Sequence, residues 1–276
     1  MKKTVGSLLR QKQIGKKISM LTCYDYTTAK LMEEAKVDTI LVGDSLGMTM
    51  LGYPDTLSVT MEDMIHHTKA VCRGVDETFV IADMPFMSYQ TSVRDALINA
   101  GRLIKETGAN AVKLEGGAAV CEQIHAITDA GIPVCAHIGM TPQSVNAMGG
   151  FKVQGKDVER AQQIVDDALA VQEAGAFMVV LECIPADLAA IITEKLQIPT
   201  IGIGAGARCD GQVLVWQDMM AMNDDFVPKF VKQFVQGGVI MKDAIHDYDE
   251  AVKAGTFPEE PKNSFKIDPE VIAQIK

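Results

Sequence analysis

The stretch "TILVGDS" at residues 39–45 has the pattern that decides the fold. Consecutive apolar residues, from Ile40 to Val42, are typical of a strand that is buried on both faces, as in a parallel sheet. The strand then ends at a carboxylate and a hydroxyl, Asp44 and Ser45. Because an ionised carboxylate is costly to bury without a partner, Asp44 either caps the next turn or belongs to a polar site at the end of the strand.

Similar apolar runs recur along the chain, and most of them are followed by an amphipathic segment. Such continuous runs suit parallel strands that are covered on both faces. The predicted strands lie at 18–25, 39–45, 79–86, 111–117, 133–140, 177–185, 199–206 and, least distinctly, 226–230.

The segments between these runs carry helix signals. Thr60 and Asp63 have the spacing of a capping box, and Ser92 and Asp95 repeat it. Glycines close several of these segments, as is common at helix ends. The predicted helices lie at 60–74, 92–108, 156–175 and 185–196.

Eight strand–helix units in about 250 residues predict an α/β fold, a single-domain (β/α)₈ TIM barrel. An open, doubly wound sheet is the structural alternative. We expect residues 1–276 to form one domain, with an N-terminal extension at 1–17 and a C-terminal tail at 258–276 that packs on the outside.

Composition and charge exclude several classes of protein. The 276 residues are 47% hydrophobic and 22% charged, which is an ordinary globular composition. The net charge of −10 argues against a nucleic-acid partner. No apolar run reaches the roughly 18 residues of a membrane span, and no signal-peptide pattern follows the basic N-terminus. We therefore expect a cytoplasmic protein without a membrane partner.

Cysteine spacing gives no sign of a disulfide framework or a structural zinc site. The six cysteines include no CxxC pair, and a chain of this length does not need disulfides to be stable. Free thiols, mostly buried, are the expected state.

Polar residues stand at the C-terminal ends of the predicted strands. In a barrel these ends face one mouth, where catalytic groups sit. Any one of them could be a helix cap or a member of an ion pair, but carboxylates that gather in one place repel each other and need positive charge nearby. The residues are Tyr24, Asp25, Asp44, Ser45, Asp83, Lys113, Glu115, His137 and Glu182.

Three of the acids, Asp44, Asp83 and Glu115, come from consecutive predicted strands. Donor sets made only of oxygen suit a hard cation, most naturally Mg²⁺. Zinc would prefer a cluster of cysteine and histidine, which the sequence lacks. Lys113 can supply one positive charge, and a divalent cation would supply more.

Glu182 and the glycine-rich segment 202–206 each allow two interpretations. Glu182 follows an apolar strand across the barrel from the other acids, which suits a general base for an unactivated C–H bond; alternatively it is paired with Lys113 or His137. The glycines could cradle a phosphate, as in other barrels, or could allow tight turning and close packing.

Several specific motifs occur along the chain in a fixed order: "TCYDYTTAKL", "LVGDSLGM", "ADMPFMSY", "VKLEGG", "HIGMTPQSVNAMGGFKVQG", "LECIP" and "IGIGAGARCDGQVLV". In these motifs the sequence resembles the ketopantoate hydroxymethyltransferase family. The resemblance covers most of residues 20–230 in the family's order. It implies transfer of a hydroxymethyl group from 5,10-methylenetetrahydrofolate to 3-methyl-2-oxobutanoate, which gives 2-dehydropantoate (ketopantoate) for pantothenate and coenzyme A biosynthesis. It also implies a homodecamer, a pentamer of dimers.

The resemblance also implies a role for each site residue. Asp44, Asp83 and Glu115 match Mg²⁺ ligands, and Glu182 matches the proton acceptor. A lyase of the phosphoenolpyruvate mutase and isocitrate lyase type is an alternative enzyme, but its "KKCGH" motif is absent here. A binding barrel without activity is a second alternative. The residues that match substrate contacts are Asp44, Ser45, Asp83, Lys113 and His137.

Overall fold

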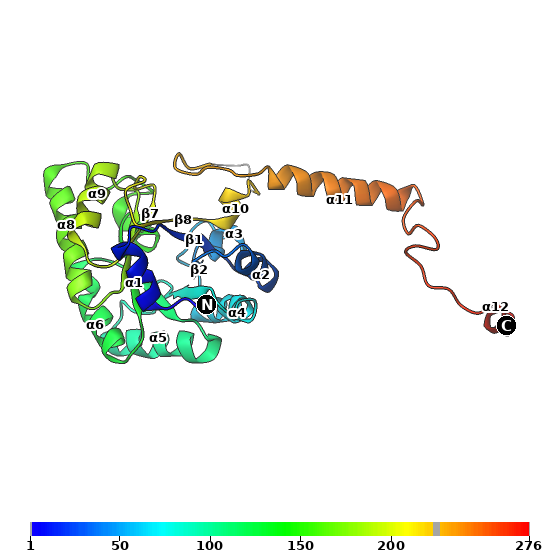
Figure 1. Cartoon of the computed structure of the whole chain (residues 1–276), viewed down its shortest axis with the longest axis horizontal. Helices are drawn as coiled ribbons and strands as arrows, with labels where there is room; N and C mark the ends of the chain where they lie inside the picture. Colours follow the sequence, from blue (N-terminus) through cyan, green and yellow to red (C-terminus); the bar gives the residue numbers. More distant parts are fainter. Residues whose placement is uncertain (1, 223–226, 276) are drawn as a thin grey trace. The chain divides into compact units, whose positions relative to one another are not determined.

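A computed structural model describes residues 2–222 and 227–275. Eight parallel strands close into a barrel in which each strand pairs with its neighbours in the chain and β1 pairs with β8 (Figure 1). The predicted (β/α)₈ barrel is therefore confirmed, and the open sheet is excluded. The strands are β1 (Ile18–Thr22), β2 (Thr39–Val42), β3 (Phe79–Asp83), β4 (Ala111–Glu115), β5 (Val134–Gly139), β6 (Met178–Glu182), β7 (Thr200–Ile203) and β8 (Gly211–Leu214).

Helices follow most of the strands. Those after β1 to β6 bury their apolar faces against the outside of the barrel. The helices are α1 (Val5–Gln13), α2 (Tyr26–Glu34), α3 (Leu46–Thr49), α4 (Met61–Arg73), α5 (Val93–Thr107), α6 (Cys121–Asp129), α7 (Val145–Met148), α8 (Val158–Glu173), α9 (Ala186–Lys195), α10 (Trp216–Met219), α11 (Gly237–Lys253) and α12 (Pro269–Ile272).

The capping signals in the sequence locate the helices correctly. Thr60 and Asp63 exchange hydrogen bonds in a capping box at the start of α4. Ser92 accepts the backbone N–H of Asp95 at the start of α5, and Gly108 follows that helix in the left-handed conformation. The four helices predicted from the sequence correspond to α4, α5, α8 and α9.

The strand predicted at 226–230 is wrong. The first residue of that range lies outside the described residues, and the others form no strand. The eighth strand is β8, which escaped detection because it starts with glycine and buries its side chains only in part. Gly211 is required there, since a Cβ atom would lie 2.4 Å from a carbonyl oxygen of β1. The apolar signal comes instead from Phe230, which packs against the barrel interior.

The strands bury side chains on both faces, which explains their continuous apolar runs. Alternate residues point into the barrel or outward to the helices. In β3, for example, Phe79 and Ile81 belong to the interior core, whereas Val80 and Ala82 belong to the core beneath the helices.

Helix α1 closes the N-terminal end of the barrel. Leu8 is fully buried and packs with the interior core. Gln11 Nε2 donates to Asp38 Oδ1 (3.0 Å) just before β2, and Lys12 Nζ lies 2.7 Å from Asp210 Oδ2 just before β8. The segment predicted as an extension thus covers this end of the barrel, whereas the predicted polar site lies at the opposite, C-terminal end of the strands.

The chain forms two compact units. The first contains the barrel and includes Pro228–Val231. The second contains α11, where most side chains are exposed, and α12. The single domain and the outward packing of the tail stay predictions. Within the residues described, no helix is long and apolar enough to cross a bilayer. The six cysteines are free thiols, as predicted.

Candidate functional site

Strand alternation turns the polar residues at the strand ends toward the barrel interior. In β3 the inward side chains are Phe79 and Ile81, so Asp83 points inward as well. The pairing register sets Asp83 beside Lys113. The polar residues that point inward at the C-terminal ends of the strands are Asp83, Lys113, Glu115, His137 and Glu182.

The ammonium of Lys113 lies among the acids. It is 3% exposed, and its Nζ lies 3.1 Å from Asp83 Oδ1 and 3.8 Å from Glu115 Oε1. Asp44 joins the cluster from the loop after β2, because its backbone N–H donates to Asp83 Oδ2 (3.1 Å). Burial lowers the pKa of Lys113, but the three carboxylates outweigh burial and hold that pKa above its ordinary value. The structure therefore brings Asp44, Asp83, Lys113 and Glu115 together around one fixed positive charge.

One lysine does not satisfy three buried carboxylates. Burial, then the charges of Asp83 and Glu115, raises the pKa of Asp44 well above its ordinary value. Burial also raises the pKa of Asp83, and Lys113 offsets this only in part. Burial acts in the same direction on Glu115, but His137 and Lys113 outweigh it and lower the pKa of Glu115. More positive charge near Asp44 and Asp83 would stabilise their ionised forms.

The donor chemistry of the cluster fits a hard divalent cation. Asp44, Asp83 and Glu115 offer only carboxylate oxygens. The buried Oδ1 of Asp83 makes no hydrogen bond of good geometry, although Lys113 Nζ is close. Among the described residues, no three His, Cys, Asp or Glu side chains are spaced to hold a metal ion together. Because Mg²⁺ is commonly held by only one or two protein carboxylates, with water or substrate at its other positions, the cluster fits such an ion without enclosing it.

His137 connects the acid cluster to Glu182. Its Nδ1 lies 3.3 Å from Glu115 Oε1, and its Nε2 lies 3.2 Å from Glu182 Oε2, an ion-pair distance without hydrogen-bond geometry. Burial and Lys113 lower the pKa of His137, but Glu115 and Glu182 outweigh them and raise it to about 9. The Glu182 side chain is 13% exposed, against 3% for that of Glu115. Glu182 thus has His137 as a partner, as the alternative interpretation expected, and is also the more accessible carboxylate.

The polar residues after β1 have separate roles. Asp25 accepts the backbone N–H of Thr28 (2.8 Å) and caps α2, so it is not a member of the acid cluster. The Tyr24 hydroxyl lies 2.8 Å from Ser45 Oγ. This contact positions Ser45 at the start of α3, directly after Asp44.

Sequence reasoning missed Gln143 and Tyr89. Gln143 lies in the 3-10 helix Pro142–Ser144 after β5, and its Nε2 donates to Asp44 Oδ2 (2.8 Å). The Tyr89 hydroxyl donates to Gln143 Oε1 (2.7 Å). The available signal was the motif "TPQS", but a neutral amide in a loop carries no charge pattern that would suggest a role.

The glycines after β7 pack closely against other elements. A Cβ atom at Gly206 would lie 2.4 Å from that of Ala186 in α9, and one at Gly204 would lie 2.9 Å from the ring of Phe230. This supports close packing as the reason for these glycines. Phosphate binding at 202–206 stays untested.

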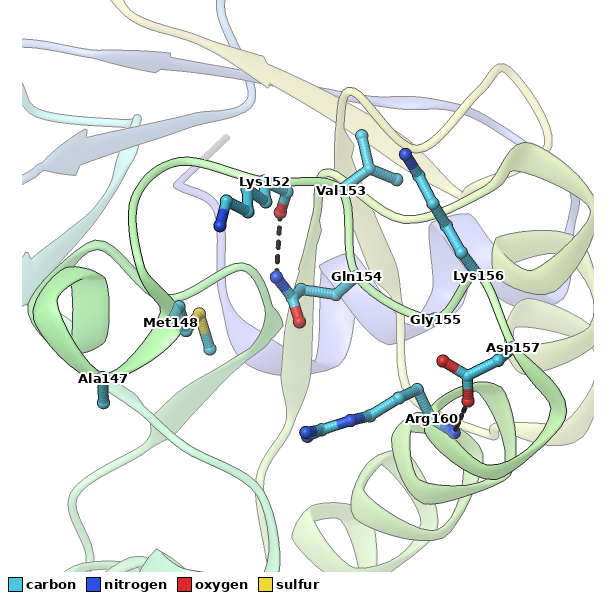
Figure 2. Close-up of a pocket in the computed structure, with 9 residues that line it drawn as sticks. All are labelled: Ala147, Met148, Lys152, Val153, Gln154, Gly155, Lys156, Asp157 and Arg160. Carbon is cyan, nitrogen blue, oxygen red and sulfur yellow. Dashed lines mark hydrogen bonds between the residues drawn. The ribbon is translucent and has the colours of Figure 1, made fainter.

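A cavity lined by cations lies at the N-terminal end of α8 (Figure 2). Its volume is about 350 Å³, and Lys152, Lys156 and Arg160 contribute to its lining. A second cavity of about 160 Å³ shares Arg160 and extends to Gly116, the residue after Glu115. The acid cluster lines neither cavity, so the cavities lie beside the buried carboxylates rather than around them.

Comparison with known proteins gives one consistent family. The sequence pattern of the family described as "Ketopantoate hydroxymethyltransferase" matches residues 2–260. The 3-methyl-2-oxobutanoate hydroxymethyltransferase of Clostridium novyi (strain NT) is 62% identical over 275 residues, with 100% of both chains covered. The protein of the same name from Enterococcus faecalis is 59% identical, again with 100% of both chains covered.

Solved structures show the same fold at low identity. Phosphonopyruvate hydrolase superposes with a TM-score of 0.62 at 14% identity, covering 99% of this chain and 94% of that one. A 2,3-dimethylmalate lyase, a member of the PEP mutase/isocitrate lyase superfamily, gives a TM-score of 0.56 at 14% identity, with 99% and 94% covered. At such identity these matches support the barrel fold alone.

Proposed function

Because the chain belongs to the ketopantoate hydroxymethyltransferase family, we propose that it transfers a hydroxymethyl group from 5,10-methylenetetrahydrofolate to 3-methyl-2-oxobutanoate, giving 2-dehydropantoate for pantothenate and coenzyme A biosynthesis. The observation that carries this proposal is the layer of acids, lysine and histidine inside the C-terminal end of the barrel. Active sites of this fold lie at that end.

The reaction requires removal of a proton from C3 of the keto acid, which is a weak acid in water. Asp44, Asp83 and Glu115 are the carboxylates that would hold a Mg²⁺ ion, with water or substrate at its other positions. When bound, this ion supplies positive charge that polarises the keto group and its carboxylate. Ser45, whose hydroxyl is positioned by that of Tyr24, would donate a hydrogen bond to the same carboxylate.

Lys113, Glu182 and His137 take the remaining roles in the proposed reaction. Lys113 adds a positive charge near the developing oxyanion and needs no reorientation, because Asp83 and Glu115 hold it in place. Glu182 accepts the C3 proton, and His137 orients Glu182 from its other side. The enolate carbon forms a C–C bond with the methylene carbon of the donor as one C–N bond breaks, and the freed nitrogen takes the proton held by Glu182. Water then replaces the second C–N bond: its oxygen becomes the hydroxyl of 2-dehydropantoate, and its proton goes to the released tetrahydrofolate nitrogen.

The cavities beside the site give the donor a place to bind. A folate carries carboxylates at one end, and Lys152, Lys156 and Arg160 supply cations in a chain whose net charge is −10. The acid in the lining of the larger cavity, Asp157, caps α8, and the acid in the lining of the smaller cavity, Asp167, accepts the backbone N–H of Ala118. The smaller cavity extends from Arg160 to the residue next to Glu115. We assign the anionic end of the donor to this lining, with its one-carbon unit toward the acid cluster.

Assembly and location are proposed from family membership. A homodecamer, a pentamer of dimers, is the expected assembly, and the cytoplasm is the expected compartment. Light scattering of the purified chain tests the assembly: a mass near ten times 29.8 kDa supports it, and a monomer contradicts it.

The activity is tested with the purified full chain, the keto acid, the folate donor and Mg²⁺, with 2-dehydropantoate measured by mass spectrometry. Product should depend on the donor and should disappear when EDTA is added. Asp83→Asn should abolish product. Asp25→Asn is the matched control, because Asp25 also ends a strand but only caps α2, and asparagine caps helices equally well. Absence of product from the unmodified chain under all conditions contradicts the proposal.

A further inference from the structure

Gln143 is the most fully bonded polar side chain next to the acid cluster. It is 4% exposed, although it lies in a loop after β5. Its Nε2 donates to Asp44 Oδ2 (2.8 Å) and to the carbonyl oxygen of Met84 (2.9 Å). Its Oε1 accepts from the Tyr89 hydroxyl (2.7 Å) and from Gln90 Nε2 (3.1 Å). Both donors and both lone pairs of the amide are therefore used.

These contacts fix which way the amide faces. The carbonyl of Met84 can only accept a hydrogen bond, so the nitrogen of Gln143 must face it. That nitrogen also faces Asp44, and it can only donate. The Asp44 oxygen at this contact must therefore accept the hydrogen bond, which fixes the orientation of its carboxyl group.

Gln143 also reaches a second acid. Its backbone N–H donates to Glu115 Oε2 (3.0 Å), and the same Tyr89 hydroxyl that bonds its side chain accepts the backbone N–H of Glu115 (3.0 Å). One residue thus ties the carboxylate after β2 to the carboxylate at the end of β4. Both carboxylates are nearly inaccessible to water, so few other groups can set their orientation.

Building on the proposed function, we propose that Gln143 is a positioning residue that holds Asp44 and Glu115 in the arrangement that Mg²⁺ and the keto acid require. It acts through its hydrogen bonds to the two carboxylates. Hydrogen-bond partners of metal ligands typically change metal affinity or activity by about 10–100-fold when they are removed.

The test is Gln143→Met, which keeps the length of the side chain but removes both of its donors. Calorimetry of the full chain with Mg²⁺ alone should show a dissociation constant raised about tenfold or more. In turnover, the Mg²⁺ concentration for half-maximal rate should rise more than kcat falls, because saturating ion restores the arrangement.

Gln11→Met is the matched control. Gln11 is also a buried glutamine (6% exposed), and its Nε2 donates to an aspartate, Asp38, at the other end of the barrel. A purely structural role would lower the melting temperature of both variants and leave Mg²⁺ binding unchanged in both. The positioning role predicts weaker Mg²⁺ binding only in Gln143→Met.

Tyr89→Phe tests the positioning role of Gln143 if the Gln143→Met variant does not fold. It removes the hydroxyl that orients the Gln143 amide and changes little else in volume, and it should weaken Mg²⁺ binding by a few-fold. Wild-type affinity in the folded variants overturns the role of Gln143 and leaves the proposed function intact. Failure of the wild-type chain to bind Mg²⁺ overturns both the role of Gln143 and the metal-assisted function.

Discussion

Replacing Lys113 by methionine should lower the free energy of unfolding by about 3–5 kcal/mol, because it leaves buried carboxylates without their cation. Lys113 Nζ lies 3.1 Å from an Asp83 oxygen and 3.8 Å from a Glu115 oxygen. At an effective dielectric constant of about 20, these distances correspond to Coulomb attractions of about 5 and about 4 kcal/mol, before the cost of burying the charges is subtracted. For a chain of this size the loss corresponds to a melting temperature lower by about 6–20 °C.

Urea unfolding followed by circular dichroism measures this loss. The pKa values of Asp44 and Asp83 are raised in the folded protein, so folding already disfavours their ionised forms. Removing Lys113 raises these pKa values further, and the loss should grow as the pH rises from about 5 to about 8. Added Mg²⁺ should recover part of it, by up to about 2.7 kcal/mol at a hundredfold excess over the dissociation constant.

Lys12→Met is the control. Lys12 pairs with Asp210 at the closed end of the barrel, where the two side chains are 14% and 16% exposed. Lys12→Met should lose less free energy of unfolding than Lys113→Met. Added Mg²⁺ should stabilise Lys12→Met no more than it stabilises the wild type. A loss below about 1 kcal/mol in Lys113→Met, or one that does not change with pH, would refute the reasoning that Lys113 neutralises the buried acids.

Other changes give further expected outcomes. Glu182→Gln should keep Mg²⁺ and keto-acid binding but slow exchange of the C3 proton into D₂O by about 10²–10⁴-fold; unchanged exchange removes Glu182 from the role of base. Asp83→Ala should weaken Mg²⁺ binding in calorimetry, and an unchanged affinity means that it is not a ligand. Arg160→Ala should raise KM for the folate donor several-fold without changing C3 exchange, and an unchanged KM contradicts the proposed donor site. Asp38→Asn should cost about 1.5–3 kcal/mol at neutral pH. Burial raises the pKa of Asp38, but Lys3, Gln11 and the Ser19 N–H outweigh burial and lower that pKa. The difference in free energy of unfolding between the variant and the wild type should therefore shrink as the pH falls below about 4. A difference that persists below about pH 4 contradicts the view that ionised Asp38 stabilises the fold.

Most of the fold could be predicted because seven strands carry their signal locally. A run such as Phe79–Asp83 is apolar on both faces, and the helix that follows it starts at a capping residue, Ser92. β8 could not be predicted in this way. It is a four-residue strand whose identity depends on fitting between β1 and β7, with glycine at the closest approach.

The candidate site could be predicted in part. Asp83, Lys113 and Glu115 follow apolar runs and alternate residues point the same way, so the sequence places all three inside the C-terminal end of any eight-stranded parallel barrel. The involvement of Gln143 could not be foreseen, because its contacts join segments 99 residues apart in the chain. The pairing of His137 with both Glu115 and Glu182 was likewise not specified by spacing.

The amino-acid sequence by itself determined which segments are strands and helices, and which polar residues end the strands, because periodicity, capping and apolar content act within a few residues of each other. Only the tertiary structure decided that α1 closes the barrel, that β8 completes it, and that Lys113, His137 and Gln143 divide the contacts to the three acids among themselves. The reason is physical: a buried charge is stabilised by whichever groups lie within a few ångströms of it, and that neighbourhood exists only once the barrel has closed.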